Sequence, residues 1–140
     1  MTALSPPQKS LQLHFAQVDI FSHFLMVTVH EDVVFQKPHL EALYDIFLTY
    51  FPNRPFGYIA HRKYGYTVDP TCYIDSQEGP WLAAMAVVCY SQAAYDAALF
   101  ERKFYKNRPY KPFYEMEACL KWIERRVSEH KIDRPPVGSH

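Results

Sequence analysis

The chain has 140 residues, of which 49% are hydrophobic and 16% aromatic, and its 15 basic residues equal its 15 acidic residues in number. This length suits one packed domain, and zero net charge excludes a global field that would attract nucleic acid or an anionic membrane. No apolar stretch has the length of a membrane span or a signal peptide. We therefore expect one cytoplasmic domain over 1–140, with a core at about 11–127 and frayed tails at 1–9 and 131–140.

The cysteines and histidines show no spacing that is typical of a metal site. Cys72, Cys89 and Cys119 are odd in number and form no C-x-x-C pair, and the histidines form no H-x-H or H-x-x-x-H pair. The sequence thus predicts reduced, buried thiols, with no disulfide framework, metal or cofactor.

The first half of the chain predicts strands on either side of one helix. Alternating apolar residues from Leu11 to Phe15 and a run of β-formers from Ile20 to Val29 indicate two antiparallel strands with a tight turn after Asp19. After Lys37, apolar residues recur at helical spacing until Pro52, which predicts an amphipathic helix. The short aromatic segment 55–61 then predicts a strand.

The second half adds a buried strand and three helices. Asp69 as N-cap and Pro70 at the first helical position predict a brief helix that ends at Gly79-Pro80. The apolar run 81–89 predicts a central strand buried on both faces. Ser91 is the expected N-cap of the next helix, whose core-facing stripe is predicted to be Ala93, Ala97, Phe100 and Phe104.

A last helix is expected after Tyr110-Lys111-Pro112. Glutamates fall in its first turn and arginines near its end, and its predicted inward residues are Met116, Cys119, Leu120, Ile123 and Val127. The order β-β-α-β-α-β-α-(β)-α places helices between parallel strands joined by right-handed crossovers. The predicted fold class is α/β, with a mixed four- to five-stranded sheet and helices packed on it.

Four features resemble the SpoIIAA-like, or STAS, domain family over about Leu11 to Val127. They are the opening strand pair, the strand with Gly57-Tyr58-Ile59, the buried strand before Tyr90-Ser91, and the ending Phe113-x-x-x-Glu117-Ala118-x-x-Trp122-Ile123. The family includes anti-sigma factor antagonists and the cytoplasmic ends of sulfate transporters. The resemblance therefore implies a SpoIIAA-like fold and a bacterial regulatory role through protein contact.

The resemblance also points to the start of the helix after the third strand, where antagonists carry a phosphorylated serine or threonine. That position falls within 66–71, where Thr67 and Thr71 offer hydroxyls. The usual D-S-S-G-type stretch is missing and Pro70 replaces small residues, so kinase switching is not expected.

The best candidate site is the loop that follows the strand 55–61. Arg62 offers paired donors for an anion or phosphate, and Tyr64 or Tyr66 offers a stacking face beyond the carboxyl end of a strand. The alternative is a solvated connection whose tyrosines cover the sheet edge. As a partner surface, the loop comprises Arg62, Tyr64, Tyr66, Thr67, Asp69 and Thr71.

Other patterns leave weaker hypotheses. The basic stretch 102–111 is interpreted as a solvated helix end, so no nucleic-acid partner is expected. Nucleophilic catalysis would need Cys72 or Cys89 beside His61, with Asp69 to orient the imidazole, and Cys89 is interpreted as inert because it lies in the apolar run. The aromatic excess could be core, a homodimer interface or a cavity for a lipid-like ligand, lined by residues such as Phe21, Phe24, Tyr44, Phe47, Tyr50 and Phe51.

These observations favour a non-enzymatic binding or regulatory module that acts through an unidentified protein partner. The alternative is a carrier or sensor of a small hydrophobic or anionic ligand. An uncharacterised enzyme is the third hypothesis.

Overall fold

The computed structural model describes residues 4–131, which form one main sheet of six strands in the order β1-β2-β3-β5-β7-β8. Neighbours are antiparallel from β1 to β3 and parallel from β3 to β8. The α/β class and the mixed sheet are confirmed, with six strands where four to five were expected. The strands are β1 (Lys9–Gln12), β2 (Ala16–Ile20), β3 (Phe24–Val29), β5 (Phe56–Arg62), β7 (Leu82–Cys89) and β8 (Tyr110–Phe113).

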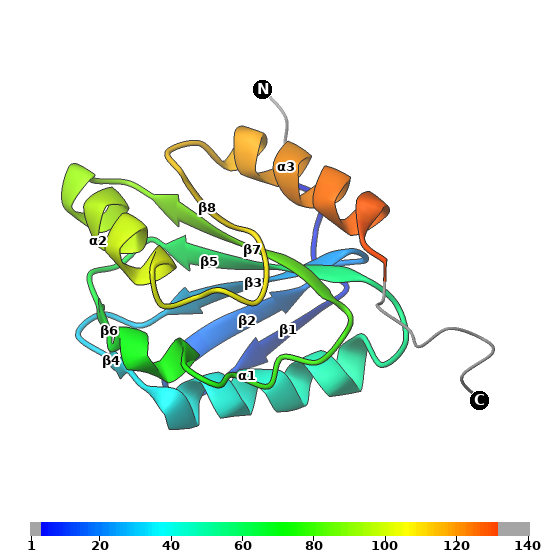
Figure 1. Ribbon diagram of the computed structural model, residues 1–140, viewed down its shortest axis with the longest axis horizontal. Coiled ribbons are helices and arrows are strands. Elements are labelled where there is room, and N and C mark those ends of the chain that lie inside the picture. The colour runs from blue at the N-terminus through cyan, green and yellow to red at the C-terminus, as the bar shows by residue number, and fades with distance from the viewer. Residues whose placement is uncertain (1–3, 132–140) are drawn as a thin grey trace.

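Helices lie on both faces of this sheet (Figure 1). α1 (Lys37–Tyr50), the 3-10 helix η1 (Pro70–Tyr73) and α2 (Gln92–Arg102) contribute to the core on one face, and α3 (Met116–Glu129) to the core on the other. A second, two-stranded parallel sheet pairs β4 (Val34–Phe35) with β6 (Thr67–Val68). None of the helices in residues 4–131 combines the length and apolar character needed to cross a bilayer.

The opening strands differ from the prediction of two strands that turn after Asp19. Three strands form, and the chain reverses at 13–15 and again at 21–23. The burial pattern explains the first reversal, because apolar residues occupy odd positions up to Phe15 and even positions from Ala16 to Ile20. At the second reversal, the rings of Phe21 and Phe24 stack with centroids 4.5 Å apart across the turn.

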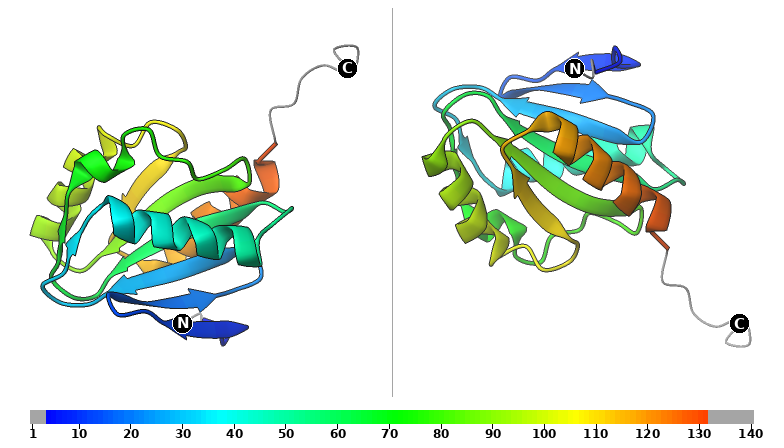
Figure 2. Two further views of the ribbon diagram at one scale, coloured as in Figure 1. Left: turned by 90° about the horizontal axis from the view of Figure 1, so that it is seen from below. Right: turned by 90° about the horizontal axis from the view of Figure 1, so that it is seen from above.

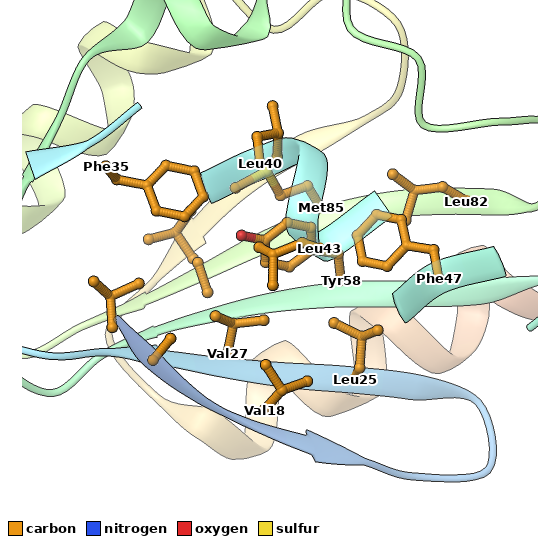
Figure 3. Packing of buried hydrophobic residues seen from close by; sticks show 14 of the residues in the cluster. Val18, Leu25, Val27, Phe35, Leu40, Leu43, Phe47, Tyr58, Leu82 and Met85 are labelled. Carbon is orange, nitrogen blue, oxygen red and sulfur yellow. The ribbon is translucent and has the colours of Figure 1, made fainter. Parts of the chain in front are cut away.

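The predicted helix after Lys37 is confirmed as α1, which packs on the sheet. Figure 3 shows Leu40, Leu43 and Phe47 directed toward side chains from the strands, including Leu25 and Tyr58. The Phe47 ring lies 5.6 Å from the Tyr58 ring in an edge-on contact. Burying each large apolar side chain contributes about 1.5–3 kcal/mol, so this layer is a main source of stability.

The central strand and the last helix are also confirmed. All eight residues of β7 are buried, and β7 lies between β5 and β8. Cys119, Trp122 and Ile123 form the buried face of α3, with Met116, Leu120 and Val127 partly buried beside them. The optional strand predicted before the last helix is present as β8. The three cysteines are buried and unpaired.

The predicted face of α2 is wrong by about a quarter turn or more. Ser91 does cap the helix, accepting a 3.1 Å hydrogen bond from the Ala94 N–H. The buried helix residues, however, are Ala98 and Glu101, whereas Ala93 and Ala97 are exposed and Phe100 is 53% exposed. Phe104, the last residue of the predicted stripe, lies just beyond the helix and is packed against the core as expected. Glu101 faces inward because it pairs with Arg62 at the buried end of a strand, where an unpaired charge would be costly.

The brief helix expected after Asp69 is a single 3-10 turn. The Asp69 carboxylate accepts a 3.0 Å bond from the Thr71 N–H and Pro70 is the first helical residue, as predicted. The turn ends at Tyr73, well before Gly79-Pro80, and Asp75 then adopts a left-handed conformation with φ 56°.

We expect Asp75→Gly to leave the free energy of unfolding unchanged or raise it slightly, and Asp75→Ala to lower it by about 1 kcal/mol. A Cβ atom is disfavoured at positive φ, where aspartate is tolerated better than alanine. Asp45, an exposed residue within α1, serves as the control. There the glycine variant should be less stable than the alanine variant, because glycine weakens a helix by about 1 kcal/mol relative to alanine. Urea denaturation of the four variants measures both orders, and a more stable Asp75→Ala than Asp75→Gly would contradict the assignment.

The tails were expected at 1–9 and 131–140. Residues 1–3 and 132–140 lie outside the described part of the chain. Within it, the main sheet begins earlier than the predicted core start at Leu11, because Gln8 N donates a 2.8 Å bond to Ile20 O and β1 begins at Lys9.

Candidate functional site

The carboxyl ends of the parallel strands meet at one edge of the sheet, close to α2, β4 and β6 (Figure 1). The residues that follow these ends are His30 after β3, Lys63 and Tyr64 after β5, Tyr90 after β7 and Tyr114 after β8. Ligands of open α/β sheets bind in crevices beyond this edge. The loop predicted from the sequence therefore lies where such a site is expected.

This loop is fixed to the preceding connection by backbone hydrogen bonds. Asp32 N donates to Gly65 O at 2.8 Å, and Thr67 N donates to Val33 O at 3.0 Å. Together with the β4–β6 pairing, these bonds give the loop one defined path. It is an ordered part of the sheet edge, which is the property that a recognition surface needs.

Arg62 has a different environment from the one expected for an anion donor. It is the last residue of β5 and is buried, and its terminal nitrogens donate to both carboxylate oxygens of Glu101 in α2, with Nη1 at 3.1 Å from Oε2. The paired donors are thus already engaged inside the protein. The pair joins the sheet edge to α2.

The surroundings of Arg62 keep its guanidinium charged. Burial favours a lower pKa, but Tyr66 and Glu101 outweigh it and raise the pKa of Arg62 above its ordinary value. Arg62 Cζ lies 5.5 Å from the centroid of the half-buried Tyr66 ring, and Tyr110 donates its hydroxyl to Glu101 at 3.4 Å. Arg62 and Tyr66 are therefore scaffold residues as well as parts of the site.

A first hollow, of about 410 Å³, lies between the loop and α2. We call it the α2 hollow. Tyr64 and Phe100, both largely exposed, belong to its walls, and the Arg62–Glu101 pair belongs to its lining. Its lining residues are Arg62, Tyr64, Gly65, Tyr66, Thr67, Val68, Pro70, Ser91, Ala93, Ala94, Ala97, Phe100 and Glu101.

A second hollow, of about 280 Å³, shares only Tyr64 with the first. We call it the sheet hollow, because it is formed by side chains of β2, β3 and β5 and the residues after them. Its lining is mostly polar and comprises Gln17, Asp19, Met26, Thr28, His30, His61, Lys63 and Tyr64. Tyr64 is thus common to two neighbouring depressions.

His61 connects the sheet hollow to Tyr90. Its Nε2 lies 2.7 Å from the Tyr90 hydroxyl and its Nδ1 lies 3.3 Å from Thr28 Oγ1. Burial and the neighbouring Lys63 lower the pKa of His61, while Asp19 acts in the opposite direction. The imidazole is therefore neutral at pH 7 and orients Tyr90.

Not all of the predicted site residues come together. Arg62, Tyr64, Tyr66 and Thr67 line the α2 hollow, whereas Asp69 and Thr71 are not among its lining residues. Asp69 and Thr71 instead bond to one another, with Thr71 Oγ1 donating to Asp69 Oδ1 at 2.7 Å. Their role in the structure is to start η1.

Sequence reasoning missed the contribution of α2. The stripe of Ala93, Ala97 and Phe100 was recognised but was predicted to face the core. A signal for the true orientation existed, since Ala94, Ala98 and Glu101 share the same i, i+4, i+7 spacing. The sequence does not show that Arg62 ends a buried strand and needs a carboxylate partner. Without that information, the stripe that contains Glu101 is not preferred over the purely apolar one.

Two members of the candidate catalytic group are neighbours, because Cys72 N donates a 3.0 Å bond to Asp69 O at the start of η1. His61 bonds to Thr28 and Tyr90, and Cys72 is buried, with burial and Asp69 raising the pKa of its thiol to about 12. A thiol with a raised pKa is a poor nucleophile. Over residues 4–131, no group of three histidine, cysteine or acidic side chains is arranged to bind a metal ion.

Comparison with known proteins found no match to a family model, a curated protein or a solved structure. The class that the geometry defines is an α/β domain with a mixed six-stranded sheet and an aromatic carboxyl edge.

Proposed function

We propose that the chain is a non-enzymatic, STAS-like binding module that regulates through protein–protein contact. The observation that carries the proposal is a set of four exposed aromatic side chains, three at the carboxyl edge of the sheet and one on the neighbouring helix α2. Their exposed fractions are 44% for Tyr64, 58% for Tyr90, 53% for Phe100 and 47% for Tyr114. We call these four residues the aromatic edge.

Exposed aromatics that cluster at one edge are typical of protein interfaces, where tyrosine is enriched among the residues that dominate affinity. Two of these tyrosines are already oriented by neighbours. Tyr90 is bonded to His61, and Tyr114 stacks on Tyr95 at 4.3 Å and donates to Gln92 at 3.2 Å. Pre-ordered side chains lose little entropy on binding, which favours a contact role.

The α2 hollow provides a place for an anchor side chain of the partner. Its exposed apolar residues are contributed by Ala93, Ala97 and Phe100 on one side and Tyr64 on the other. A partner that inserts an apolar side chain here removes both aromatic rings from water, which contributes about 25 cal/mol per Å² buried. We propose a protein partner with such an anchor as the occupant.

The resemblance to STAS domains supports the same surface. The family's regulatory position follows the strand predicted at 55–61, which is β5 in the structure, and here Thr67 and Pro70, on either side of Asp69, line the α2 hollow. The proposed contact surface thus borders the position that the resemblance singles out. It does not require phosphorylation of Thr67 or Thr71.

Substitutions at the aromatic edge test the proposal. A partner is captured with the wild-type chain, identified by mass spectrometry and purified, and its Kd is measured by calorimetry. Tyr64→Ala and Phe100→Ala should each raise the Kd by about tenfold or more, as expected for anchor residues. Both side chains are largely exposed, so the thermal midpoint should change little.

Leu48→Ala is the matched control, because Leu48 is a 65% exposed apolar residue on α1, away from the carboxyl edge. It should leave the Kd within twofold of the wild-type value. An unchanged Kd for both edge variants contradicts the proposal. Capture of only a second copy of the chain replaces it with a homodimer interface.

A second candidate function is supported by an apolar groove on the other face of the sheet. The groove has a volume of about 500 Å³, and Leu4, Phe21, Phe24 and Leu120 are its apolar members. The cavity predicted among the aromatic residues in and after α1 is filled, because Phe47 and Phe51 are buried against Phe56. The groove is therefore the better place for a small hydrophobic ligand. Native mass spectrometry after mild purification tests this carrier role, and an apo mass without a thermal shift across a lipid panel would refute it.

A further inference from the structure

The sheet hollow lies on a part of the sheet that α3 leaves uncovered. α3 packs over β5, β7 and β8, and Figure 2 shows β1 and β2 beyond its edge. On this uncovered surface β2 contributes Gln17 and Asp19, and β3 contributes Thr28. The hollow is therefore a polar depression, distinct from the aromatic α2 hollow.

The negative group of the sheet hollow is satisfied within the chain. The Asp19 carboxylate accepts hydrogen bonds from Ser10 at 2.7 Å and from Gln17 at 3.0 and 3.2 Å. With three bonds to neutral donors, Asp19 is stabilised without a cation. These bonds hold the Asp19 carboxylate at the β1–β2 side of the hollow.

The side chains of Lys63 and His30 have no such hydrogen-bond partners among the described residues. Across residues 4–131, Lys63 forms no ion pair, and its ammonium has only the face of the Tyr64 ring, 5.6 Å from the centroid. The His30 ring likewise forms no hydrogen bond with the described residues, although it lines the hollow. Lys63 and His30 are therefore two lining residues of one hollow whose donors are not engaged by other described side chains.

We propose that the sheet hollow binds a small anionic ligand through a carboxylate or phosphate group, with Lys63 and His30 as donors and Tyr64 flanking the ligand. A lysine ammonium and an imidazole N–H can both donate to the oxygens of such a group, and hydrogen bonds to an ionised acceptor are the short, charge-assisted bonds by which proteins recognise anions. A volume of about 280 Å³ suits a small molecule or the anionic end of a larger one. The site does not use Arg62, which is engaged by Glu101.

Binding of a carboxylate, whose own charge is constant near neutral pH, should become tighter as the pH falls. His61 faces Lys63 and His30 in the hollow, Asp19 from β2, Thr28 from β3 and the Tyr90 hydroxyl. Burial and Lys63 hold the pKa of His61 below its ordinary value, and a bound anion opposes both effects. The ligand raises the pKa of His61, so by linkage the protonated protein binds the ligand more tightly.

NMR titration with inorganic phosphate and with benzoate, each against sodium chloride at equal ionic strength, tests the site. Saturable shifts of the Thr28, His30 and Lys63 amides are expected with one probe or both, together with a rise in the pKa of His61. The phosphate arm identifies a phosphate group and the benzoate arm a carboxylate. Shifts identical to those with chloride in both arms would overturn the proposal.

Lys63→Ala should weaken the binding of the effective probe about tenfold, the loss expected for one charge-assisted bond. The matched control is Lys111→Ala, because Lys111 is exposed and also lies over an aromatic ring, 5.3 Å from the Phe113 centroid. An equal loss for both variants would mean general charge attraction and would contradict the site. Neither lysine belongs to the aromatic edge, so failure here is distinguishable from failure of the proposed protein contact.

Discussion

Glu101→Ala should lower the free energy of unfolding by about 3–5 kcal/mol. The substitution leaves the buried Arg62 guanidinium without its carboxylate partner, and an uncompensated buried charge is one of the most costly defects in a protein. Arg62 cannot release its proton to avoid this cost, because its ordinary pKa lies far above neutral pH. Chemical denaturation followed by circular dichroism measures the loss.

Three controls isolate the cause. Glu101→Gln retains oxygen and shape, so its loss should be smaller. Arg62→Met combined with Glu101→Leu removes both charges and should recover much of the stability. Glu124→Ala, at an exposed position of α3, should change stability by less than about 0.5 kcal/mol. A loss of less than about 1 kcal/mol for Glu101→Ala would show that the pair does not stabilise the junction of α2 and the sheet.

Gly57→Ala should destabilise the protein by about 1–3 kcal/mol through overpacking. A Cβ atom at Gly57 would lie 2.6 Å from Cγ2 and 3.0 Å from Cδ1 of Ile123. Ile123 is buried in the face of α3 that contacts the sheet, so it cannot move away freely. The absence of a side chain at Gly57 is what permits α3 to approach β5 so closely.

A double-mutant cycle with Ile123→Ala tests this mechanism. Ile123→Ala alone should cost about 2–5 kcal/mol by leaving a cavity. In the double variant the new methyl group occupies part of that cavity, so the combined loss should be smaller than the sum of the two single losses. Strictly additive losses would place the cost of Gly57→Ala in β5 itself and not in its contact with α3.

Patterns that depend on local chemistry predicted most of the fold correctly. The helix after Lys37, the buried strand before Tyr90 and the Ser91 cap were identified because periodicity, continuous apolarity and capping are properties of neighbouring residues. The opening strands were divided in the wrong places, although the change of phase at Phe15 and Ala16 contained the information. The boundary was missed because both segments are rich in β-formers.

The site was harder to predict because it depends on contacts across the fold. The loop after β5 was placed correctly at the sheet edge, but Arg62 was assigned to solvent because its partner, Glu101, is 39 residues away. The same contact determines which face of α2 is buried, and so exposes Phe100. The Arg62–Glu101 ion pair thus accounts for the main difference between the predicted surface and the surface of the structure.

Tyr64 belongs to both proposed binding sites. It lines the α2 hollow, where a partner side chain is proposed, and the sheet hollow, where a small anion is proposed. Occupation of either hollow fixes one side of its ring. Binding experiments on Tyr64 variants should therefore include Lys63→Ala and Phe100→Ala, each of which affects one hollow alone.

Photocrosslinking from single positions tests the central claim, that the aromatic edge is the surface that contacts a protein partner. A photoreactive phenylalanine analogue is placed at Tyr64, at Phe100 or, as the control, at Leu48 on α1, and the products formed in extracts of the source cells are identified by mass spectrometry. We expect one and the same partner protein from positions 64 and 100, and no such product from position 48. A partner captured from position 48 but not from 64 or 100 would contradict it.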